Sequence, residues 1–174
     1  MSLHAKLTAL LLALSALAMV SCLTDRAART AQVETVEAVD GFSYVMNRDW
    51  VLSEIRTALE TVTLDRYELA ERFFGSIFTM RFDGNLVSGT AVPNTYRGPY
   101  ALADGQAITI GPLGTTRMAT SVQPDELTEH GFINYMYNAF MWDLAEGNLE
   151  LELHTTAADG TETVLVFVLL QAGE

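Results

Sequence analysis

Four short turns recur between residues 83 and 161, and each contains an acidic residue followed by glycine. They are Asp83-Gly84-Asn85, Asp104-Gly105-Gln106, Glu146-Gly147-Asn148 and Asp159-Gly160-Thr161. Glycine accepts the positive φ angle that a tight hairpin turn requires, so an acid–glycine pair between apolar runs is a strong hairpin signal. The pattern therefore predicts four β-hairpins and a largely antiparallel sheet.

The runs that flank these turns have the periodicity of strands. In residues 149–154 leucines alternate with polar residues, which is typical of a strand with one buried face and one face in water. Residues 164–170 are apolar throughout, so we expect a central strand that is covered on both faces. The expected strands span residues 50–52, 61–64, 77–82, 86–90, 96–102, 107–110, 149–154 and 164–170.

One segment has the spacing of a helix instead. It follows Pro124, where Asp125 and Glu126 suit a helix N-terminus. Its apolar residues at helical spacing are Leu127, Phe132, Ile133, Met136, Tyr137, Phe140 and Met141. Such a helix has to bury its apolar stripe against the hairpins. The expected fold class is therefore mostly β, an antiparallel hairpin meander that forms a small barrel or half-barrel with one packed α-helix.

The N-terminus has the pattern of an export signal. Lys6 precedes a mostly apolar run over residues 7–20, which is shorter than the roughly 20 residues of a membrane span. Cys22 directly follows the small residue Ser21, and this junction resembles the lipobox of bacterial lipoproteins. The resemblance implies a signal over residues 1–21, acylation of Cys22, for example with palmitate, and attachment to a membrane. An ordinary cleaved signal with an incidental cysteine is the alternative.

The region after the signal is weakly patterned. Residues 22–46 are expected to form a tether, with a short helix within residues 29–39 as the alternative, and the folded domain is expected over residues 47–171. The chain has 22 acidic against 10 basic residues, a net charge of −12, which disfavours nucleic acid as a partner. One cysteine forms no internal disulfide, and no metal or cofactor motif is recognised.

Two segments resemble a known domain family. Residues 87–100 (VSGTAVPNTYRGPY) and 108–119 (ITIGPLGTTRMA) are similar to motifs of the META domain, also called the HslJ-like domain. The resemblance covers about residues 50–170 and implies a lipocalin-like β-barrel with one helix, found in exported and envelope proteins of bacteria. It implies no enzyme activity. Many members have cysteines where this chain has Pro93 and Thr120, so no redox role is carried over.

The candidate site residues lie in these two motifs. They are Asn94, Tyr96, Arg97 and Arg117. An arginine in so acidic a protein requires a partner, which is either a carboxylate of the protein or the anionic group of a ligand. Asn94 can also be interpreted as a turn residue. No catalytic residue is expected, and the groups interpreted as solvated are His130, His154, Glu150 and Glu152.

Two functional hypotheses follow. We expect a non-enzymatic envelope lipoprotein with an accessory role in envelope stress or secretion, exerted through contacts with another envelope protein. The expected location is the periplasmic face of the outer membrane, with the inner membrane or the cell surface as alternatives. The second hypothesis is a barrel pocket for an apolar or amphipathic small molecule. A packed interior is favoured by the bulky residues Phe74, Phe78, Met80, Phe82, Trp142 and Phe167. A third functional hypothesis is an inhibitor of exported hydrolases, but no residue of the sequence supports it.

Overall fold

The computed structural model describes residues 41–119, 123–145, 147 and 149–170. The chain divides into two units, residues 1–38 and Val39–Glu174, and every described residue belongs to the second. The predicted signal, Cys22 and most of the predicted tether lie outside the described residues. The elements are β1 (Trp50–Thr57), β2 (Thr61–Thr63), α2 (Arg66–Glu71), β3 (Thr79–Asp83), β4 (Leu86–Thr90), β5 (Thr95–Leu102), β6 (Ile108–Ile110), β7 (Gly114–Thr115), α3 (Glu129–Tyr137), β8 (Met141–Ala145), β9 (Glu150–Thr156) and β10 (Glu162–Leu169).

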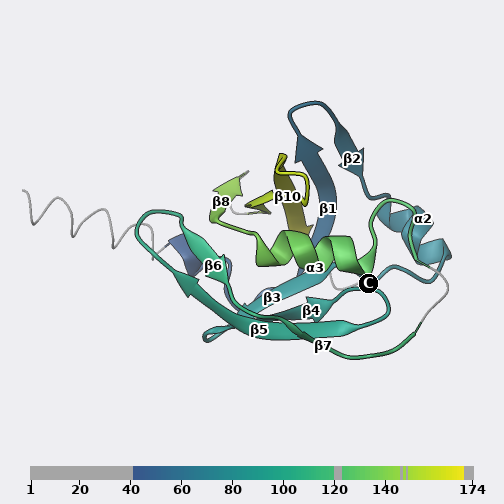
Figure 1. The fold of residues 1–174 in the computed structure, drawn as a ribbon, viewed down its shortest axis with the longest axis horizontal. Coiled ribbons are helices and arrows are strands. Elements are labelled where there is room, and N and C mark those ends of the chain that lie inside the picture. Colours follow the sequence, from purple (N-terminus) through teal and green to yellow (C-terminus); the bar gives the residue numbers. More distant parts are fainter. Residues whose placement is uncertain (1–40, 120–122, 146, 148, 171–174) are drawn as a thin grey trace, which may run out of the picture. The chain divides into compact units, whose positions relative to one another are not determined.

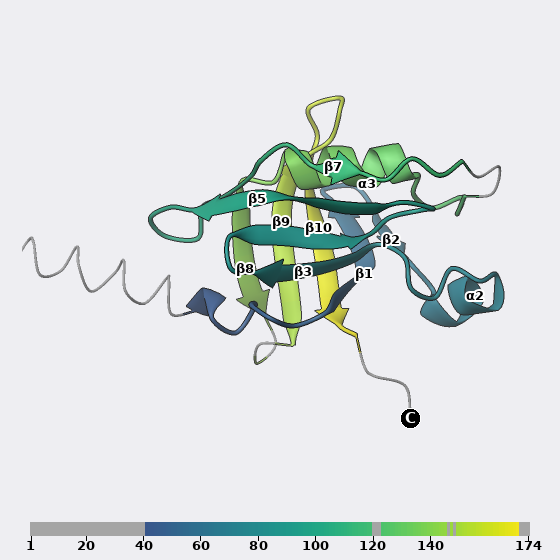
Figure 2. The same cartoon turned by 90° about the horizontal axis from the view of Figure 1, so that it is seen from below.

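The strands form an antiparallel sheet that curls into a nearly closed barrel, which confirms the expected fold class. Hydrogen-bonded neighbours follow the order β6-β5-β4-β3-β1-β10-β9-β8, with β2 added to β1 and β7 added to β5. The two ends of this order meet where Ala107 bridges Met141 and the Ile108 amide donates to Phe140 O over 3.1 Å. Helix α3 packs against β6 and β9 and covers one end of the barrel (Figures 1 and 2).

Strand β1 joins the two halves of the sheet, which are β6-β5-β4-β3 and β10-β9-β8. Strands β8, β9 and β10 run crosswise to β3 and β5 (Figure 2). β1 pairs with β10 along its whole length but with β3 through Trp50 and Val51 alone. Its register shifts between Leu52 and Glu54. A bulge of this kind bends a strand and increases its twist, so it allows the two halves to cross.

All four predicted hairpins are confirmed. The turns join β3 to β4, β5 to β6, β8 to β9 and β9 to β10. Their glycines have positive φ angles, +58° at Gly84, +72° at Gly105, +67° at Gly147 and +88° at Gly160. In the last turn the Asp159 carboxylate accepts the Thr161 amide over 2.9 Å, a bond that lowers the pKa of Asp159.

The predicted helix is present, but it is shorter at both ends. α3 begins at Glu129 and not near Pro124, because Thr128 is the N-cap and its hydroxyl accepts the Gly131 amide over 3.1 Å. The helix ends at Tyr137. The prediction was therefore wrong for three of its apolar positions, since Leu127 precedes the N-cap, Phe140 follows the helix and Met141 begins β8.

The first strand of the β3–β4 hairpin also begins later than predicted. Residue 77 was expected as its start, but β3 begins at Thr79. Phe78 has a φ of +52°, which no regular strand residue adopts, and its carbonyl accepts the Leu52 amide over 2.9 Å. The predicted inward face is confirmed, because Phe78, Met80 and Phe82 are all 0% exposed.

Helix α2 was not predicted. Its six residues follow Asp65, whose carboxylate caps the helix by accepting the amides of Tyr67 and Glu68. The Arg66 guanidinium turns back to donate to the carbonyls of Leu52 and Ile77. Burial lowers the pKa of Arg66 to about 10. These contacts hold the α2 segment against the bulged part of β1.

Two residues of the predicted tether belong to the core. Phe42 and Val45 are 1% and 0% exposed, and the Phe42 ring lies 5.1 Å from the Phe82 ring and 4.9 Å from the Trp142 ring. The folded part therefore includes Phe42 and extends further toward the N-terminus than the predicted boundary. The reason is that two apolar residues three positions apart lie on one side of the chain and pack into the barrel.

Candidate functional site

The four residues singled out in the sequence separate into two pairs. Asn94 and Tyr96 are buried, with 5% and 2% of their surface exposed, whereas Arg97 and Arg117 are exposed. Asn94 directly precedes β5, which contains Tyr96 and Arg97, and Arg117 follows the strand β7 that pairs with β5. The residues are neighbours in the sheet, but their side chains do not form a single cluster.

The Asn94 side chain uses its full hydrogen-bonding capacity inside the protein. Its Oδ1 accepts from the Thr116 hydroxyl over 2.9 Å and from the Met118 amide over 2.7 Å. Its Nδ2 donates to Met118 O over 3.2 Å and to Glu129 Oε2 over 3.0 Å. An asparagine has two acceptor sites and two N–H donors, so none is left for a ligand. Asn94 fastens the segment after β7, and the start of α3, to the sheet.

Tyr96 is also fully engaged. Its hydroxyl donates to Thr79 O over 2.8 Å, and its ring meets the Phe132 ring edge-on at 5.7 Å. Burial raises the pKa of Tyr96, so the hydroxyl stays protonated at neutral pH. Gly89 makes this contact possible, because a Cβ there would lie 2.8 Å from the Tyr96 hydroxyl and 1.9 Å from Thr79 O.

Bulky side chains fill the interior of the barrel. Phe132 of α3 lies 5.1 Å from the Phe78 ring and 6.5 Å from the Phe167 ring, so the helix reaches into the core. The largest side chains with less than 2% exposure include Trp50, Phe42, Phe78, Phe82, Phe132, Phe167, Met80 and Met136. The described interior positions are thus packed, as the sequence favoured.

A groove opens at the surface between α3 and the end of the sheet. It consists of two adjoining hollows of about 310 and 450 Å³ that share His130 and Ile133. We call it the α3–β7 groove, and its lining residues are Pro112, Leu113, Thr115, Gln123, Thr128, Glu129, His130, Ile133, Asn134 and Tyr137.

The groove lies where two neighbouring parts of the barrel wall are not joined by strand pairing. β6 reaches β8 through the bridge between Ala107 and Met141. β7 continues from β6, but it pairs with β5 and with no other described strand. Helix α3 lies on this side instead, held to the sheet by a 2.6 Å bond from the Thr155 hydroxyl to Tyr135 O. A second strand would cover the free edge of β7. Because a helix lies there instead, backbone groups and side chains at this edge stay exposed.

The arginines near the groove differ from three other arginines of the described residues. Arg56, Arg72 and Arg81 each form ion pairs with carboxylates. Arg97 and Arg117 form none among the residues that the structure describes. Two positive charges without an ion pair to any described residue therefore lie beside β7, although the protein as a whole is strongly acidic.

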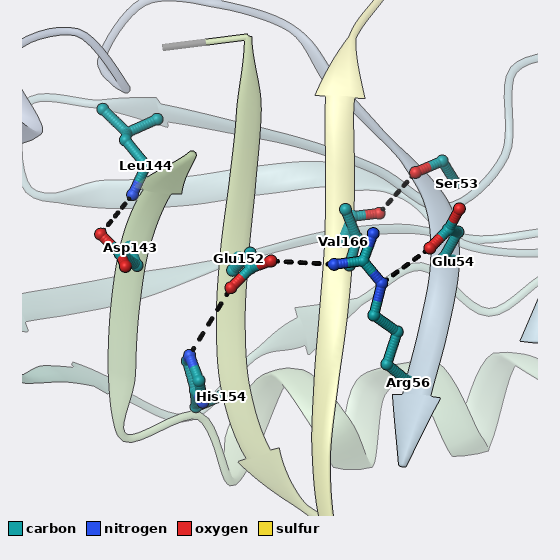
Figure 3. Close-up of polar contacts among 8 residues, drawn as sticks. All are labelled: Ser53, Glu54, Arg56, Asp143, Leu144, Glu152, His154 and Val166. Atoms are coloured by element: carbon teal, nitrogen blue, oxygen red, sulfur yellow. Dashed lines mark hydrogen bonds and ion pairs between the residues drawn. The ribbon is translucent and has the colours of Figure 1, made fainter. Parts of the chain in front are cut away.

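A second polar region covers the outer face of β1, β10 and β9 (Figure 3). Arg56 donates to Glu54 over 2.7 Å and reaches across β10 to Glu152 over 3.0 Å, and His154 lies 3.9 Å from Glu152. The hydrogen bond from Arg56 to Glu54 raises the pKa of Arg56. Val166 of β10 is 0% exposed at this face. Both carboxylates are paired with Arg56, so we interpret the region as a structural ion-pair network.

Two further properties concern the described residues alone. Within residues 41–119, 123–145, 147 and 149–170, no three His, Cys, Asp or Glu side chains are placed to hold a metal ion. In the same part of the chain, none of the helices has the length and apolar character needed to span a membrane.

The chain resembles known proteins in sequence and in fold. A family model described as META domain matches residues 43–168. An NMR structure of a protein from Burkholderia xenovorans has a TM-score of 0.56 and 22% identity, over 76% of this chain and 88% of that chain. A crystal structure of a DUF4847 family protein from Bacteroides vulgatus ATCC 8482 has a TM-score of 0.47 and 17% identity, over 73% and 95%. No curated protein matches.

Sequence reasoning did not find the groove. It assigned Ile133 and Tyr137 to the buried stripe of the helix, but Ile133 is half-buried and Tyr137 is 56% exposed. A signal was present, because the seven residues assigned to the apolar stripe are more than one face of a short helix can bury. The surplus forms one wall of the groove.

Proposed function

The chain belongs to the META domain family, as its motifs predicted, and on this basis we propose that it is a non-enzymatic accessory protein of the cell envelope that binds another envelope protein. One observation carries the proposal: the described interior is filled, whereas the α3–β7 groove is open at the surface. A filled barrel leaves little room for a substrate. An open groove with an exposed tyrosine beside it suits a protein partner.

The lack of enzyme activity is part of the proposal. Catalysis requires an acid, base or nucleophile that can reach the substrate. Among the candidates, Asn94 and Tyr96 are buried and hydrogen-bonded, and Glu152 is ion-paired with Arg56. These groups are engaged by structural partners, so none of them is free to act as an acid, base or nucleophile.

We further propose that a lipid on Cys22 holds the protein at the periplasmic face of the outer membrane. The support is the apolar run over residues 7–20 and the junction of Ser21 with Cys22. Several acyl chains anchor firmly, because each buried CH₂ contributes about 0.8 kcal/mol. Cys22→Ala should therefore move the protein from the membrane fraction to the soluble fraction, with Ser21→Ala as the control that keeps the anchor. Retention of Cys22→Ala in the membrane would contradict the anchor.

Photocrosslinking in intact cells tests the binding function. A photoreactive amino acid replaces Tyr137, which is 56% exposed in the groove, or Tyr67, which is 89% exposed on α2. We expect a defined adduct with one envelope protein from position 137. An adduct from position 67 alone would keep the binding function but move it away from the groove, and the absence of adducts from both would contradict the proposal.

A small molecule is the second candidate ligand. The hollow lined by Leu113, Ile133 and Tyr137 has a volume of about 310 Å³, and ligand pockets begin at about 300 Å³. Native mass spectrometry of the full chain in detergent separates the two candidates. A copurifying lipid that is lost in Tyr137→Ala would favour ligand binding over protein binding.

A further inference from the structure

Strand β7 has an edge that no other described strand occupies. The Thr116 amide donates to Thr95 O over 3.1 Å, and Thr115 lies opposite Tyr96. Backbone groups of an antiparallel strand alternate between its two edges, so the amide and carbonyl of Thr115 point away from β5. Neither group has a hydrogen-bond partner within the described part of the chain. An edge of this kind is a template for an additional strand.

This edge borders the α3–β7 groove. Thr115 lines the groove with His130 and Ile133. Side chains of a strand alternate between its faces, so a strand added to β7 would direct every second side chain into the groove. The surface that they would meet includes Leu113, Ile133 and the exposed Tyr137. This face of the added strand should therefore be apolar.

The other face of an added strand would lie toward Arg97. Arg97 pairs with Gly114 of β7, which has no side chain to separate the guanidinium from the next strand. Neighbouring strands are about 4.8 Å apart, so the added strand is two such spacings from β5 and within reach of an arginine side chain. Arg117 lies two residues after β7 and is also exposed, so it adds a second positive charge near this end of the strand. This face of the added strand should therefore be acidic.

We propose that the α3–β7 groove binds an extended segment of an envelope protein that alternates apolar and acidic side chains and adds to β7 as a strand. Backbone bonds to Thr115 set its position, apolar side chains enter the groove, and acidic side chains face Arg97. The inference rests on the proposed function and specifies the chemistry of the partner.

A capped, fluorescently labelled peptide of alternating valine and glutamate is the probe. Fluorescence anisotropy with the full chain in detergent should show saturable binding. A peptide with lysine in place of glutamate should bind about tenfold more weakly, because its charges face arginines. The net charge of −12 would by itself favour the lysine peptide, so preference for the glutamate peptide reports the local charge.

Methylation of the peptide backbone tests strand addition directly. The amides of the valines lie on one edge of the extended peptide and those of the glutamates on the other. N-methylation of one set should abolish binding, whereas N-methylation of the other set should leave it within about twofold, because one edge faces β7. Equal tolerance of both sets would overturn strand addition.

Variants of the protein complete the test. Arg97→Glu should weaken peptide binding about tenfold. Arg48→Glu makes the same change of charge just before β1. It should leave binding unchanged, because Arg48 does not line the groove and the start of β1 pairs with the end of β10 at Leu169. Equal effects of the two variants, or no binding of the glutamate peptide to the wild type, would overturn the proposal. So would a dimer that the peptide dissociates, since the occupant would then be a second copy of the chain.

The result of the peptide experiments can be distinguished from the result of the crosslinking test of the proposed function. If the peptide fails but photocrosslinking at position 67 captures an envelope protein, the binding function stands and the groove is not its site. If crosslinking fails at positions 67 and 137 while the peptide binds with the predicted preferences, the groove is a peptide site and the proposed envelope partner is wrong.

Discussion

Asn94 Nδ2 donates a 3.0 Å hydrogen bond to Glu129 Oε2, and this bond joins the residue before β5 to the first residue of α3. Glu129 lies in the first turn of the helix, where negative charge is favourable. The same Asn94 side chain binds the backbone of Met118 on the segment after β7. One buried amide therefore fixes the strand wall and the helix wall of the α3–β7 groove relative to each other.

Replacement of Asn94 should destabilise the domain strongly. Asn94→Ala removes four hydrogen bonds, to Thr116, Met118 and Glu129, and leaves buried polar groups without partners. We expect the free energy of unfolding to fall by about 3 kcal/mol. Urea denaturation followed by tryptophan fluorescence measures this change.

Thr95→Ala is the control for Asn94→Ala. The Thr95 side chain is exposed and adjacent in sequence, so its loss should cost less than about 0.5 kcal/mol. Similar losses for the two variants would show that the Asn94 contacts contribute little to stability.

The hairpins and the barrel could be predicted because their signals are local. A positive φ at Gly84 or Gly160 is a property of the turn itself, and the alternation that places Met80 and Phe82 inside is a property of the strand. Such features depend on neighbours two to four residues away. They are therefore visible in the sequence before any long-range contact is known.

The features that escaped prediction depend on long-range contacts. Phe78 leaves the strand pattern because its carbonyl accepts the amide of Leu52, 26 positions earlier in the chain. Phe42 belongs to the core because Phe82 and Trp142 surround it. The groove likewise depends on which strand lies beside β7. Asn94 was interpreted as a turn residue or a ligand-binding residue, but its partner Glu129 lies 35 positions away.

Gly89 should tolerate no side chain. A Cβ at Gly89 would lie 1.9 Å from Thr79 O, a backbone atom held in the sheet, so Gly89→Ala has to displace β3 or the Tyr96 ring. We expect a loss of at least about 3 kcal/mol in the free energy of unfolding. Thermal denaturation followed by circular dichroism measures it.

Gly84→Ala separates steric clash from backbone conformation. Gly84 has a φ of +58° and no atom within 4 Å of an added Cβ, so alanine there strains only the turn. Its cost should be about 1 kcal/mol. If Gly89→Ala costs no more than Gly84→Ala, the close approach of Gly89 to Thr79 does not constrain the fold.

Tyr96 should make stability fall at alkaline pH. Burial raises the pKa of Tyr96, so the folded protein keeps a proton that the unfolded chain loses above a pH of about 10. A group whose pKa is raised by folding stabilises the folded state fully below its pKa in the unfolded chain. This stabilisation is lost as the pH rises above that value. Above pH 10 the contribution of Tyr96 should therefore decrease by about 1.4 kcal/mol per pH unit.

Comparison with Tyr96→Phe isolates this effect. Arg66 also titrates in this range, but it is present in both proteins and cancels from their difference. Near pH 8 the wild type should be more stable by about 1 kcal/mol, because Tyr96→Phe loses the hydrogen bond to Thr79 O. Urea denaturation at pH 8 to 11 should show this advantage shrink and then reverse. A constant difference across the range would contradict the buried hydroxyl.

The helix should be both a plug for the barrel and a wall of the groove, and two of its residues separate these roles. Phe132 is 0% exposed and its ring contacts those of Phe78 and Tyr96, so Phe132→Ala leaves a cavity in the core and should cost about 4 kcal/mol. Tyr137 is 56% exposed, and Tyr137→Ala should cost less than about 1 kcal/mol.

Binding measurements on the same two variants complete the distinction. Tyr137→Ala should keep the fold and lose affinity for the valine–glutamate peptide, since it removes apolar surface from the groove without altering the core. Phe132→Ala should lose stability first, with binding reduced only as far as the folded fraction falls. If Tyr137→Ala binds the peptide as tightly as the wild type, the exposed half of the helix does not contact the added strand, and the apolar face of the partner must lie elsewhere.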